Sequence, residues 1–397
     1  MRAIRAAQLY DGTTFLGPGT VLVDGDTIAG VERGHPDLPD GMDVSSYDGT
    51  LLPGLIDSHV HLVSNGDAGS LERAGAASDE ELDAAIATSL AAETAGGVTT
   101  VQDLGDRGYR TLLWRSRPGL PRVVAAGPPL TVPDGHCHYL GGAAVGADGL
   151  RRAVEEHVER GVDVIKVMAT GGMVTPGTDP YAAQLTDAEL AACVGAGHAA
   201  GLRVLAHAHA LSGVELAVRV RVDGIEHFTC LTEAGVMVPD GLLDDVANAG
   251  ITVDQTLGVD ASQAPPWDQM PPGIKSVLER LGLDLESFRT TRVAHAARLR
   301  EHGVRVVAGT DAGAAPTKRH GALRLAVEEL LEAGYPAAEA LATATSVAAD
   351  ELGLGEVTGR LRAGLAADLL VVDGDLATDP EALSRPTAVV VRGAQAS

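Results

Sequence analysis

Short apolar segments alternate with alanine-rich segments of helical length through most of this 397-residue sequence. Parallel strands need a long crossover between them, and a helix commonly supplies it. Eight successive strand and helix pairs predict a parallel (β/α)8 barrel of the TIM type. We expect its strands within residues 54–62, 97–104, 121–127, 162–169, 202–209, 222–228, 251–257 and 304–311. We expect its helices near residues 78–95, 148–160, 186–200, 212–220, 232–249, 288–302, 319–333 and 336–350.

The two ends of the chain have a different pattern. Apolar positions alternate near the N-terminus and DG marks a hairpin turn, and the segments ADLLVVDGD and TAVVVRG resemble this near the C-terminus. Neither end could close a core alone, so we predict one small β-sandwich domain from residues 1–55 and 359–397, with the barrel in 56–358. An open doubly wound sheet is the alternative for the central part, but no GxGxxG follows the first strand and no P-loop occurs.

The charge balance of the chain disfavours several classes of partner. With 54 acidic and 30 basic residues, the formal net charge is −24, and no basic cluster could form a nucleic-acid-binding face. An anionic membrane surface is disfavoured for the same reason, and no apolar run is long enough to span a bilayer. Three cysteines give no disulfide framework, and no signal peptide is visible. We expect a cytoplasmic protein that acts on a small molecule, with homo-oligomerisation left open.

The first candidate site is the motif DSHVH at residues 57–61. Alternate residues of a strand point to the same face, so His59 and His61 project together. They stand at the C-terminal end of the first expected barrel strand, where the active sites of such barrels lie. Two imidazoles on one face provide half of a zinc-type site. Two core histidines with backbone partners are the alternative.

Lys166 lies within the apolar segment VDVIKVMA. A buried ammonium group is costly, so this lysine must pair, lose its proton or be modified. A deprotonated lysine can take up carbon dioxide, and the resulting carbamate is a carboxylate-like ligand that can bridge two metal ions. Alone, Lys166 would be expected to pair with Asp163 or a neighbouring carboxylate. In the company of the histidines, we interpret it as a metal ligand.

Three further strand ends carry polar residues. His207 in VLAHAHA and His227 in GIEHF stand one βα unit apart, and His209 shares a face with His207 and is expected to contact the substrate. Asp311 ends the last long strand, where a carboxylate can bind metal and accept a proton from the attacking water. A helix cap is the alternative for a strand-end aspartate, but the next expected helix begins some distance further on.

The prediction of a metal centre rests on all of these strand-end residues together and not on any one motif. Coincidence across five strand ends of one barrel is a weaker explanation than a shared site. We therefore predict a divalent metal centre, with zinc as the expected metal and two ions if the lysine is carboxylated. The expected metal ligands are His59, His61, Lys166, His207, His227 and Asp311, and the expected catalytic residues are Asp311 and Lys166.

The order and spacing of DSHVH, GVTTVQD, IKVMATGG, AHAH, GIEH and GTDAG resemble the amidohydrolase superfamily over nearly the whole chain. Its motifs are similar to those of the branch that contains Xaa-Pro dipeptidases, arginine carboxypeptidases and imidazolonepropionases. The resemblance implies a binuclear metal centre in which Lys166 is the carboxylated bridge and Asp311 is both ligand and proton shuttle. A mononuclear centre, as in some members, is the alternative.

The same resemblance implies a substrate loop. Residues 133–142 follow the third expected strand and are similar to the substrate-contacting Gly-His loop of that branch. We expect His136, His138 and Tyr139 of this loop to contact the substrate, together with His320 beyond the last strand.

The expected activity follows from these residues. A metal-bound hydroxide would attack the carbonyl carbon of an amide-type C–N bond, in a small molecule such as a dipeptide or an N-acyl amino acid. Hydrolysis of a cyclic amide (imidazolone or lactam), urea or carbamate, or deamination, are the alternative reactions. A catalytically inactive metal-binding scaffold is a different class, and it would not require Asp311. The proline-rich segment 258–287 interrupts the strand and helix rhythm and is a candidate lid.

Overall fold

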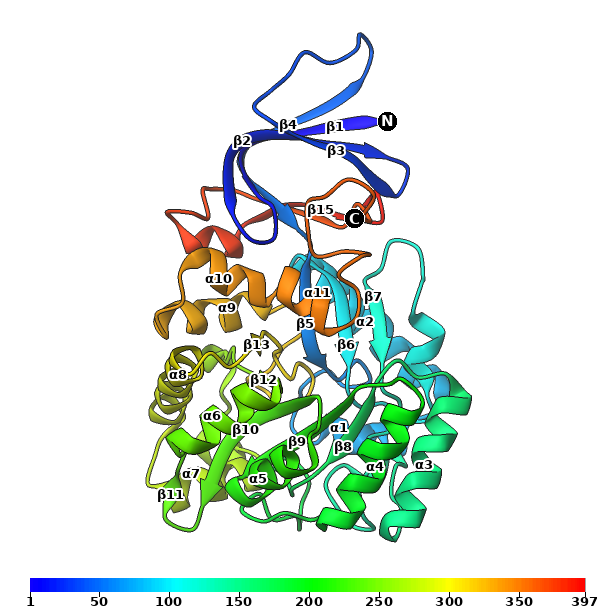
Figure 1. The fold of residues 1–397 in the computed structure, drawn as a ribbon, viewed down its shortest axis with the longest axis vertical. Helices are drawn as coiled ribbons and strands as arrows, with labels where there is room; N and C mark the ends of the chain where they lie inside the picture. The colour runs from blue at the N-terminus through cyan, green and yellow to red at the C-terminus, as the bar shows by residue number, and fades with distance from the viewer. Residues whose placement is uncertain (397) are drawn as a thin grey trace.

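The computed structural model describes residues 1–396, and it places both ends of the chain in one β-rich part (Figure 1). The strands of this part are β1 (Arg2–Tyr10), β2 (Phe15–Asp24), β3 (Thr27–Arg33), β4 (Asp43–Pro53), β14 (Leu369–Val372), β15 (Pro386–Val391) and β16 (Ala394–Gln395). They form one seven-stranded sheet in the order β16-β15-β14-β4-β1-β2-β3. The two ends of the chain meet where Leu52 of β4 lies opposite Leu370 of β14 in an antiparallel register.

The seven-stranded sheet curls over its own apolar face. The backbone N–H of Ile28 in β3 donates to the carbonyl of Leu365, so the far edge of the sheet returns to the segment that precedes β14. Leu51 and Val371 lie in the buried core that this curl encloses. The expected β-sandwich is corrected in this respect, because one continuous sheet, and not two separate sheets, surrounds the core.

The larger part of the molecule contains two parallel sheets. Their strands are β5 (Leu55–Val60), β6 (Val98–Asp103), β7 (Arg122–Ala125), β8 (Ile165–Met168), β9 (Val204–Ala210), β10 (Gly224–Thr232), β12 (Thr252–Asp254) and β13 (Val306–Val307). One sheet has the order β5-β6-β7 and the other the order β13-β12-β10-β9-β8, with β11 (Gly235–Val236) paired antiparallel to β10. Every residue of β5 and β6 is buried, as expected for parallel strands that are covered on both faces.

Single bridges join the two parallel sheets at both of their edges. At one edge, the N–H of Leu130, which follows β7, donates to the carbonyl of Lys166 in β8 at 2.8 Å. At the other edge, Val60 of β5 forms a parallel bridge with Ala312, which follows β13. The mixed α/β fold with parallel sheets and a separate β-rich part is confirmed. The closed eight-stranded barrel stays a prediction that both bridges support.

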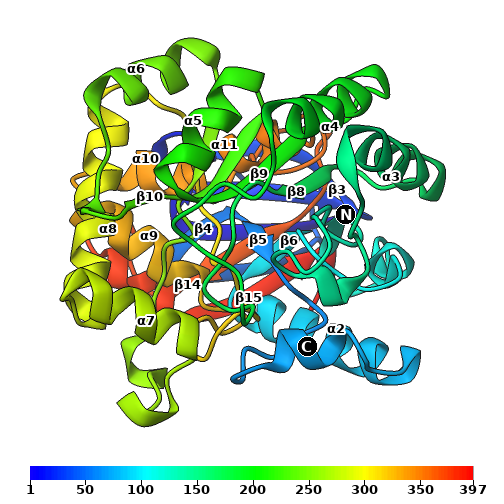
Figure 2. The same cartoon turned by 90° about the horizontal axis from the view of Figure 1, so that it is seen from below.

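Helices surround the parallel strands, and Figure 2 shows them around the rim of the molecule with β5, β6, β8, β9 and β10 towards its middle. They are α1 (Ser70–Ala74), α2 (Asp79–Ala95), α3 (Gly146–Arg160), α4 (Asp187–Ala199), α5 (Leu211–Val220), α6 (Asp240–Ala249), α7 (Pro272–Leu281), α8 (Leu285–Glu301), α9 (Leu323–Glu332), α10 (Ala337–Thr343) and α11 (Ser346–Glu351). Capping boxes begin two of them: Ser78 with Glu81 at α2, and Thr186 with Glu189 at α4. Among residues 1–396, we find no helix with the length and apolar character that a bilayer crossing requires.

The proline-rich segment that follows β12 is largely helical. It contains two 3-10 turns, η3 (Ala261–Gln263) and η4 (Trp267–Gln269), then α7 and the first turn of α8. Gly273 of α7 lies so close to the backbone of Met173 that an added Cβ would clash with it. The segment therefore packs on the loop that follows β8.

Candidate metal centre and its cavity

A cavity lies at the C-terminal ends of the parallel strands, where folds of this kind place small-molecule sites. Much of its lining is apolar, from residues Leu71, Met168, Met173, Val174, Val259, Ile274, Leu285 and Phe288. Its polar lining contains all six expected metal ligands, namely His59, His61, Lys166, His207, His227 and Asp311. The structure therefore brings together residues that are widely separated in the sequence.

The first polar group of the cavity consists of His59, His61 and Asp311. The Nε2 atoms of His59 and His61 lie 3.4 and 3.1 Å from the same carboxylate oxygen, Oδ1 of Asp311. Asp311 has a φ of 62°, which a residue other than glycine rarely adopts and which is often found at functional sites. It does not cap a helix, because α9 begins only after Ala322.

The other ring nitrogens of these two histidines show which atoms are free to bind a cation. Nδ1 of His59 lies 2.6 Å from a carboxylate oxygen of Glu226, and Nδ1 of His61 lies 3.3 Å from the carbonyl oxygen of Gly105. Because these oxygens accept hydrogen bonds, each Nδ1 is the donor. In the neutral rings, both Nε2 atoms therefore direct lone pairs towards an oxygen of Asp311. Three electron-rich atoms that converge in this way suit a metal ion.

The charges in this group respond to one another. Burial works against the charged form of His61, but the hydrogen bond and the charge of Asp311 outweigh it and raise the pKa of His61. Burial also opposes ionisation of Asp311, yet its contacts with His61 and His59 lower its pKa to about 2. Asp311 is therefore ionised at neutral pH and can serve as a metal ligand or as a base.

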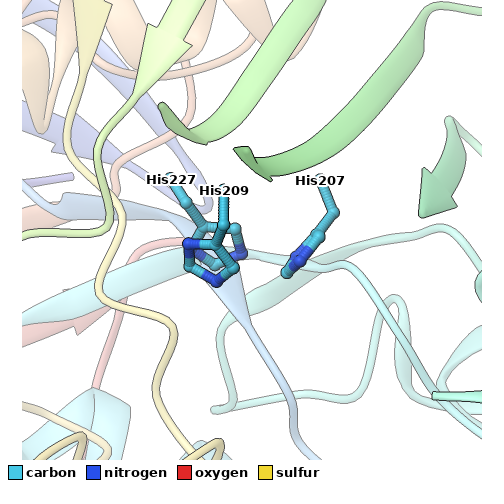
Figure 3. Close-up of side chains that lie close together, drawn as sticks. All are labelled: His207, His209 and His227. Carbon is cyan, nitrogen blue, oxygen red and sulfur yellow. The ribbon is translucent and has the colours of Figure 1, made fainter. Parts of the chain in front are cut away.

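The second polar group consists of His207 and His209 of β9 and His227 of β10 (Figure 3). Candidate ligand atoms of the three rings lie within 4.8 Å of one another. The ring centroids of His207 and His227 are 4.4 Å apart, and His209 stacks on His227 at 4.5 Å. His227 also has a positive φ of 71°. Distance alone would allow all three histidines to bind one metal ion.

Hydrogen bonds leave a lone pair on His207 and His227. Nε2 of His207 donates to the carbonyl oxygen of Gly171 at 3.2 Å, so its Nδ1 is unprotonated in the neutral ring. The Thr256 hydroxyl donates to the carbonyl oxygen of Gln255 at 2.7 Å and accepts from Nδ1 of His227 at 3.0 Å. The Nε2 atom of His227 is then available to a metal ion.

His209 is held in the opposite way. Its Nδ1 lies 2.8 Å from the hydroxyl oxygen of Thr229, and that same oxygen accepts a hydrogen bond from Nη1 of Arg292 at 3.1 Å. The Thr229 hydroxyl finds no other acceptor among the described residues, so it donates its proton to Nδ1 of His209. The neutral ring then carries its proton on Nε2. His209 therefore presents an N–H donor, whereas a ligand to a metal must present a lone pair.

Lys166 is buried and its Nζ has no hydrogen-bond partner among the described residues. Asp163, the partner considered from the sequence, pairs instead with Arg115 at 2.8 Å. Burial lowers the pKa of Lys166, although the charges of Glu226 and Asp311 act in the other direction. An unpaired amine beside the histidines fits a group that is modified or bound to metal.

Two carboxylates hold the histidine of β5 in place. Asp57 accepts from the backbone N–H of His59 at 3.1 Å and from the hydroxyl of Thr310 at 2.7 Å, which ties β5 to the segment that carries Asp311. Glu226 accepts from the ring of His59, as described above. Both carboxylates therefore orient His59, a candidate metal ligand.

Two of the five residues expected to contact the substrate line the cavity: His136 and His209. His136 is buried, its Nδ1 has no hydrogen-bond partner in the described chain, and its ring lies 4.5 Å from that of His207. Burial lowers its pKa to about 3, so the ring is neutral.

His138 and Tyr139 do not line the cavity, which corrects the expectation for this loop. The Nδ1 of His138 bonds to the carbonyl of Gly135 at 3.0 Å, within its own turn. The Tyr139 hydroxyl donates to the sulfur of Cys137 at 3.7 Å. The turn therefore directs His136 into the cavity and uses the next two polar side chains to hold its own shape.

The substrate contact expected for His320 is also corrected, because this residue does not line the cavity. Its Nδ1 lies 2.8 Å from a carboxylate oxygen of Glu93, and its Nε2 lies 2.9 Å from the carbonyl oxygen of Ser64. Burial acts against the charged form of His320, but Glu93 outweighs it and raises its pKa. With both nitrogens engaged, the ring has none left for a substrate.

Sequence reasoning missed two cations of the cavity, Arg292 of α8 and Lys318 of the loop before α9. Lys318 donates from Nζ to the carbonyl oxygens of Thr256 and Leu257 at 2.7 and 3.1 Å. Burial lowers the pKa of Lys318 to about 8 and that of Arg292 to about 10. Neither residue belongs to a strand-end motif, so the only signal was the rarity of lysine, which occurs three times in the chain.

Comparison with known proteins gives a consistent result. Residues 50–395 match the model of the amidohydrolase family. An uncharacterized protein of Mycobacterium tuberculosis is 30% identical over 364 residues, which cover 89% of this chain and 87% of that protein. The ochratoxinase of Aspergillus niger is 25% identical over 371 residues, covering 85% and 73%. The crystal structure of a Xaa-Pro dipeptidase with bound methionine superposes with a TM-score of 0.85 at 26% identity and covers 99% of both chains.

Proposed function

The chain belongs to the amidohydrolase family of metal-dependent hydrolases, and we propose that it hydrolyses an amide-type C–N bond in a small molecule such as a dipeptide or an N-acyl amino acid. The observation that carries this proposal is the convergence of unprotonated imidazole nitrogens, one carboxylate and one unpaired lysine in a single cavity. Similarity to an ochratoxinase and to a Xaa-Pro dipeptidase supports a C–N bond as the target. We also interpret the two parallel sheets as one closed barrel.

The residues present fit a pair of divalent ions, and zinc suits an imidazole and carboxylate donor set. His59, His61 and Asp311 would hold one ion, and His207 and His227 the other. Lys166, once carboxylated, would offer an oxygen to each. When bound, such ions supply an activated water and polarise the scissile carbonyl. The unpaired Nζ supports this role, since a free amine reacts with carbon dioxide and an ammonium does not.

Asp311 is the proposed proton carrier. Its carboxylate lies beside the Nε2 atoms of His59 and His61, where it could accept a proton from the attacking water and deliver it to the leaving nitrogen. Its fixed backbone conformation holds the carboxylate beside His59 and His61. A carboxylate held in this way loses little freedom when the reaction begins.

His209 is the proposed hydrogen-bond donor to the substrate. The chain of contacts from Arg292 through Thr229 keeps the proton on Nε2 of His209, which faces the cavity lining. A neutral N–H at this place can hydrogen-bond to the substrate carbonyl as negative charge develops on it. His136, with a free Nδ1, is the second proposed contact.

A substrate screen tests the proposed function. Metal-loaded protein is incubated with dipeptides, N-acyl amino acids, lactams and aryl ureas, and release of the amine is measured. We expect turnover of linear amides, and the Asp311→Asn variant serves as the inactive control. Cleavage of lactams or ureas alone would assign the alternative reaction, and failure to cleave any C–N bond with metal bound would refute the proposal.

A further inference from the structure

Arg292 and Lys318 are two cations that line the same cavity and form no ion pair within the described residues. Many other arginines of this acidic chain pair with carboxylates, as Arg203 does with Glu351 at 2.7 Å. The hydrogen bonds of Arg292 and Lys318 go instead to neutral oxygens. Arg292 is only 8% exposed. The charge of Glu329 acts on both cations, but its carboxylate accepts from the backbone N–H groups of Gly258 and Val259 and forms no ion pair with Arg292 or Lys318. Buried charges are normally paired directly, so these two cations are suited to bind an anionic group of a ligand.

The two cations flank one histidine. Arg292 donates from Nη2 to the carbonyl oxygen of His227 at 3.0 Å. Lys318 donates to the carbonyl oxygen of Thr256, the residue whose hydroxyl accepts from the ring of His227. Each cation still has N–H groups beyond those engaged in these bonds, since a guanidinium carries five and an ammonium three. An anionic group beside His227 could therefore reach both.

The surroundings of this anion subsite are apolar. Val259, Ile274, Leu285 and Phe288 come from the loop after β12, from α7 and from α8, and all line the same cavity as the two cations. A ligand that satisfies both features has an apolar side chain next to a negative charge. The C-terminal half of an N-acyl amino acid or of a dipeptide has this composition.

We propose that Arg292 and Lys318 bind the free carboxylate of the substrate, whose apolar side chain packs on α7 and α8. This inference rests on the proposed amide hydrolysis and narrows it to carboxylate-bearing amides over neutral ureas and carboxamides. Charge-assisted hydrogen bonds of a buried carboxylate give a discrimination of roughly 10- to 100-fold against its neutral amide.

The test compares matched pairs of ligands on metal-loaded wild-type protein: N-acetyl-leucine with N-acetyl-leucinamide, and N-acetyl-phenylalanine with its amide. Both kcat/KM and calorimetric affinity are measured. We expect the carboxylate to be favoured roughly 10- to 100-fold. The Lys318→Gln variant should lose most of this preference, mainly through KM. Lys275→Gln, which changes the third lysine, should keep the preference, because Lys275 lies over the ring of Trp267 and does not line the cavity.

The outcomes separate this inference from the proposed function. Cleavage of both members of each pair at equal rates would refute the anion subsite and leave amide hydrolysis intact. A calorimetric preference for the carboxylate that Lys318→Gln abolishes, without cleavage of any amide, would support the subsite and refute the hydrolysis. A preference that persists unchanged in Lys318→Gln would overturn the role of Lys318 in carboxylate binding.

Discussion

The terminal β-rich sheet and the polar lining of the cavity bury different kinds of side chain. The sheet encloses aliphatic side chains such as Leu51 and Val371, and its backbone groups pair between neighbouring strands. The polar lining of the cavity buries histidines, carboxylates and Lys166, whose Nζ has no hydrogen-bond partner in the described chain. Burial of unpaired polar groups is costly, so only the β-rich sheet stabilises the fold without a bound ligand. The second region becomes favourable when a metal ion and a substrate complete it.

Lys166→Ala should have the largest effect on activity, because it removes the residue proposed to join the two metal ions. We expect loss of metal and of measurable turnover, with partial rescue by short carboxylic acids that replace the carbamate. Metal content and rates are measured with and without formate or acetate. Retained metal without rescue would indicate a mononuclear centre and make Lys166 a structural residue.

Asp311→Asn should lower kcat by about 10² to 10⁴, the usual contribution of a positioned acid or base. The amide occupies the same space but cannot accept the water proton. Elemental analysis should still find metal, since the histidines remain. Turnover near that of the wild type would remove Asp311 from the proton transfer.

Thr229→Val should lower kcat/KM roughly tenfold, because it breaks one buried hydrogen-bond relay between Arg292 and His209. Metal content should not change, and Thr229→Ser should restore activity. Nitrogen NMR of the histidine rings reports the tautomer of His209 directly. Loss of metal in the valine variant would show that His209 is a ligand.

Leu51→Ala should have the smallest effect on activity and a clear effect on stability. Leu51 is fully buried in the core of the curled sheet and does not line the cavity. Removal of a buried leucine side chain costs about 2 to 5 kcal/mol in the free energy of unfolding. Denaturant titration measures this cost, while the kcat of the folded protein should stay unchanged. A large fall in kcat would show that the two regions are coupled.

Hydrophobic pattern was sufficient to predict most of the fold. The segment VDVIKVMA contains β8, and the helix expected at 78–95 is α2 (Asp79–Ala95). These elements are long or strongly apolar, so local sequence determines them. Pattern could not show that the terminal strands form one curled sheet, because that depends on contacts such as Ile28 with Leu365, far apart in the sequence.

The candidate site also contains residues that the sequence could predict and residues that it could not. His59 and His227 stand at the ends of apolar strands, and parallel strands bring such ends together, so their meeting could be predicted. Arg292 lies on a helix and Lys318 in a loop, where no periodicity indicates which residues face the cavity. The tautomer of His209 depends on its hydrogen bond with Thr229, whose hydroxyl also accepts from Arg292, and only the folded chain brings these residues together.

The most direct test of the metal centre is elemental analysis of protein purified without chelator, compared with the variant His59→Ala combined with His227→Ala. The geometry predicts about one to two equivalents of a divalent metal per chain in the wild type, and little in the double variant. Essentially no metal in active or folded wild-type protein would contradict the proposed metal centre, because the converging lone pairs of the cavity histidines would then have no partner.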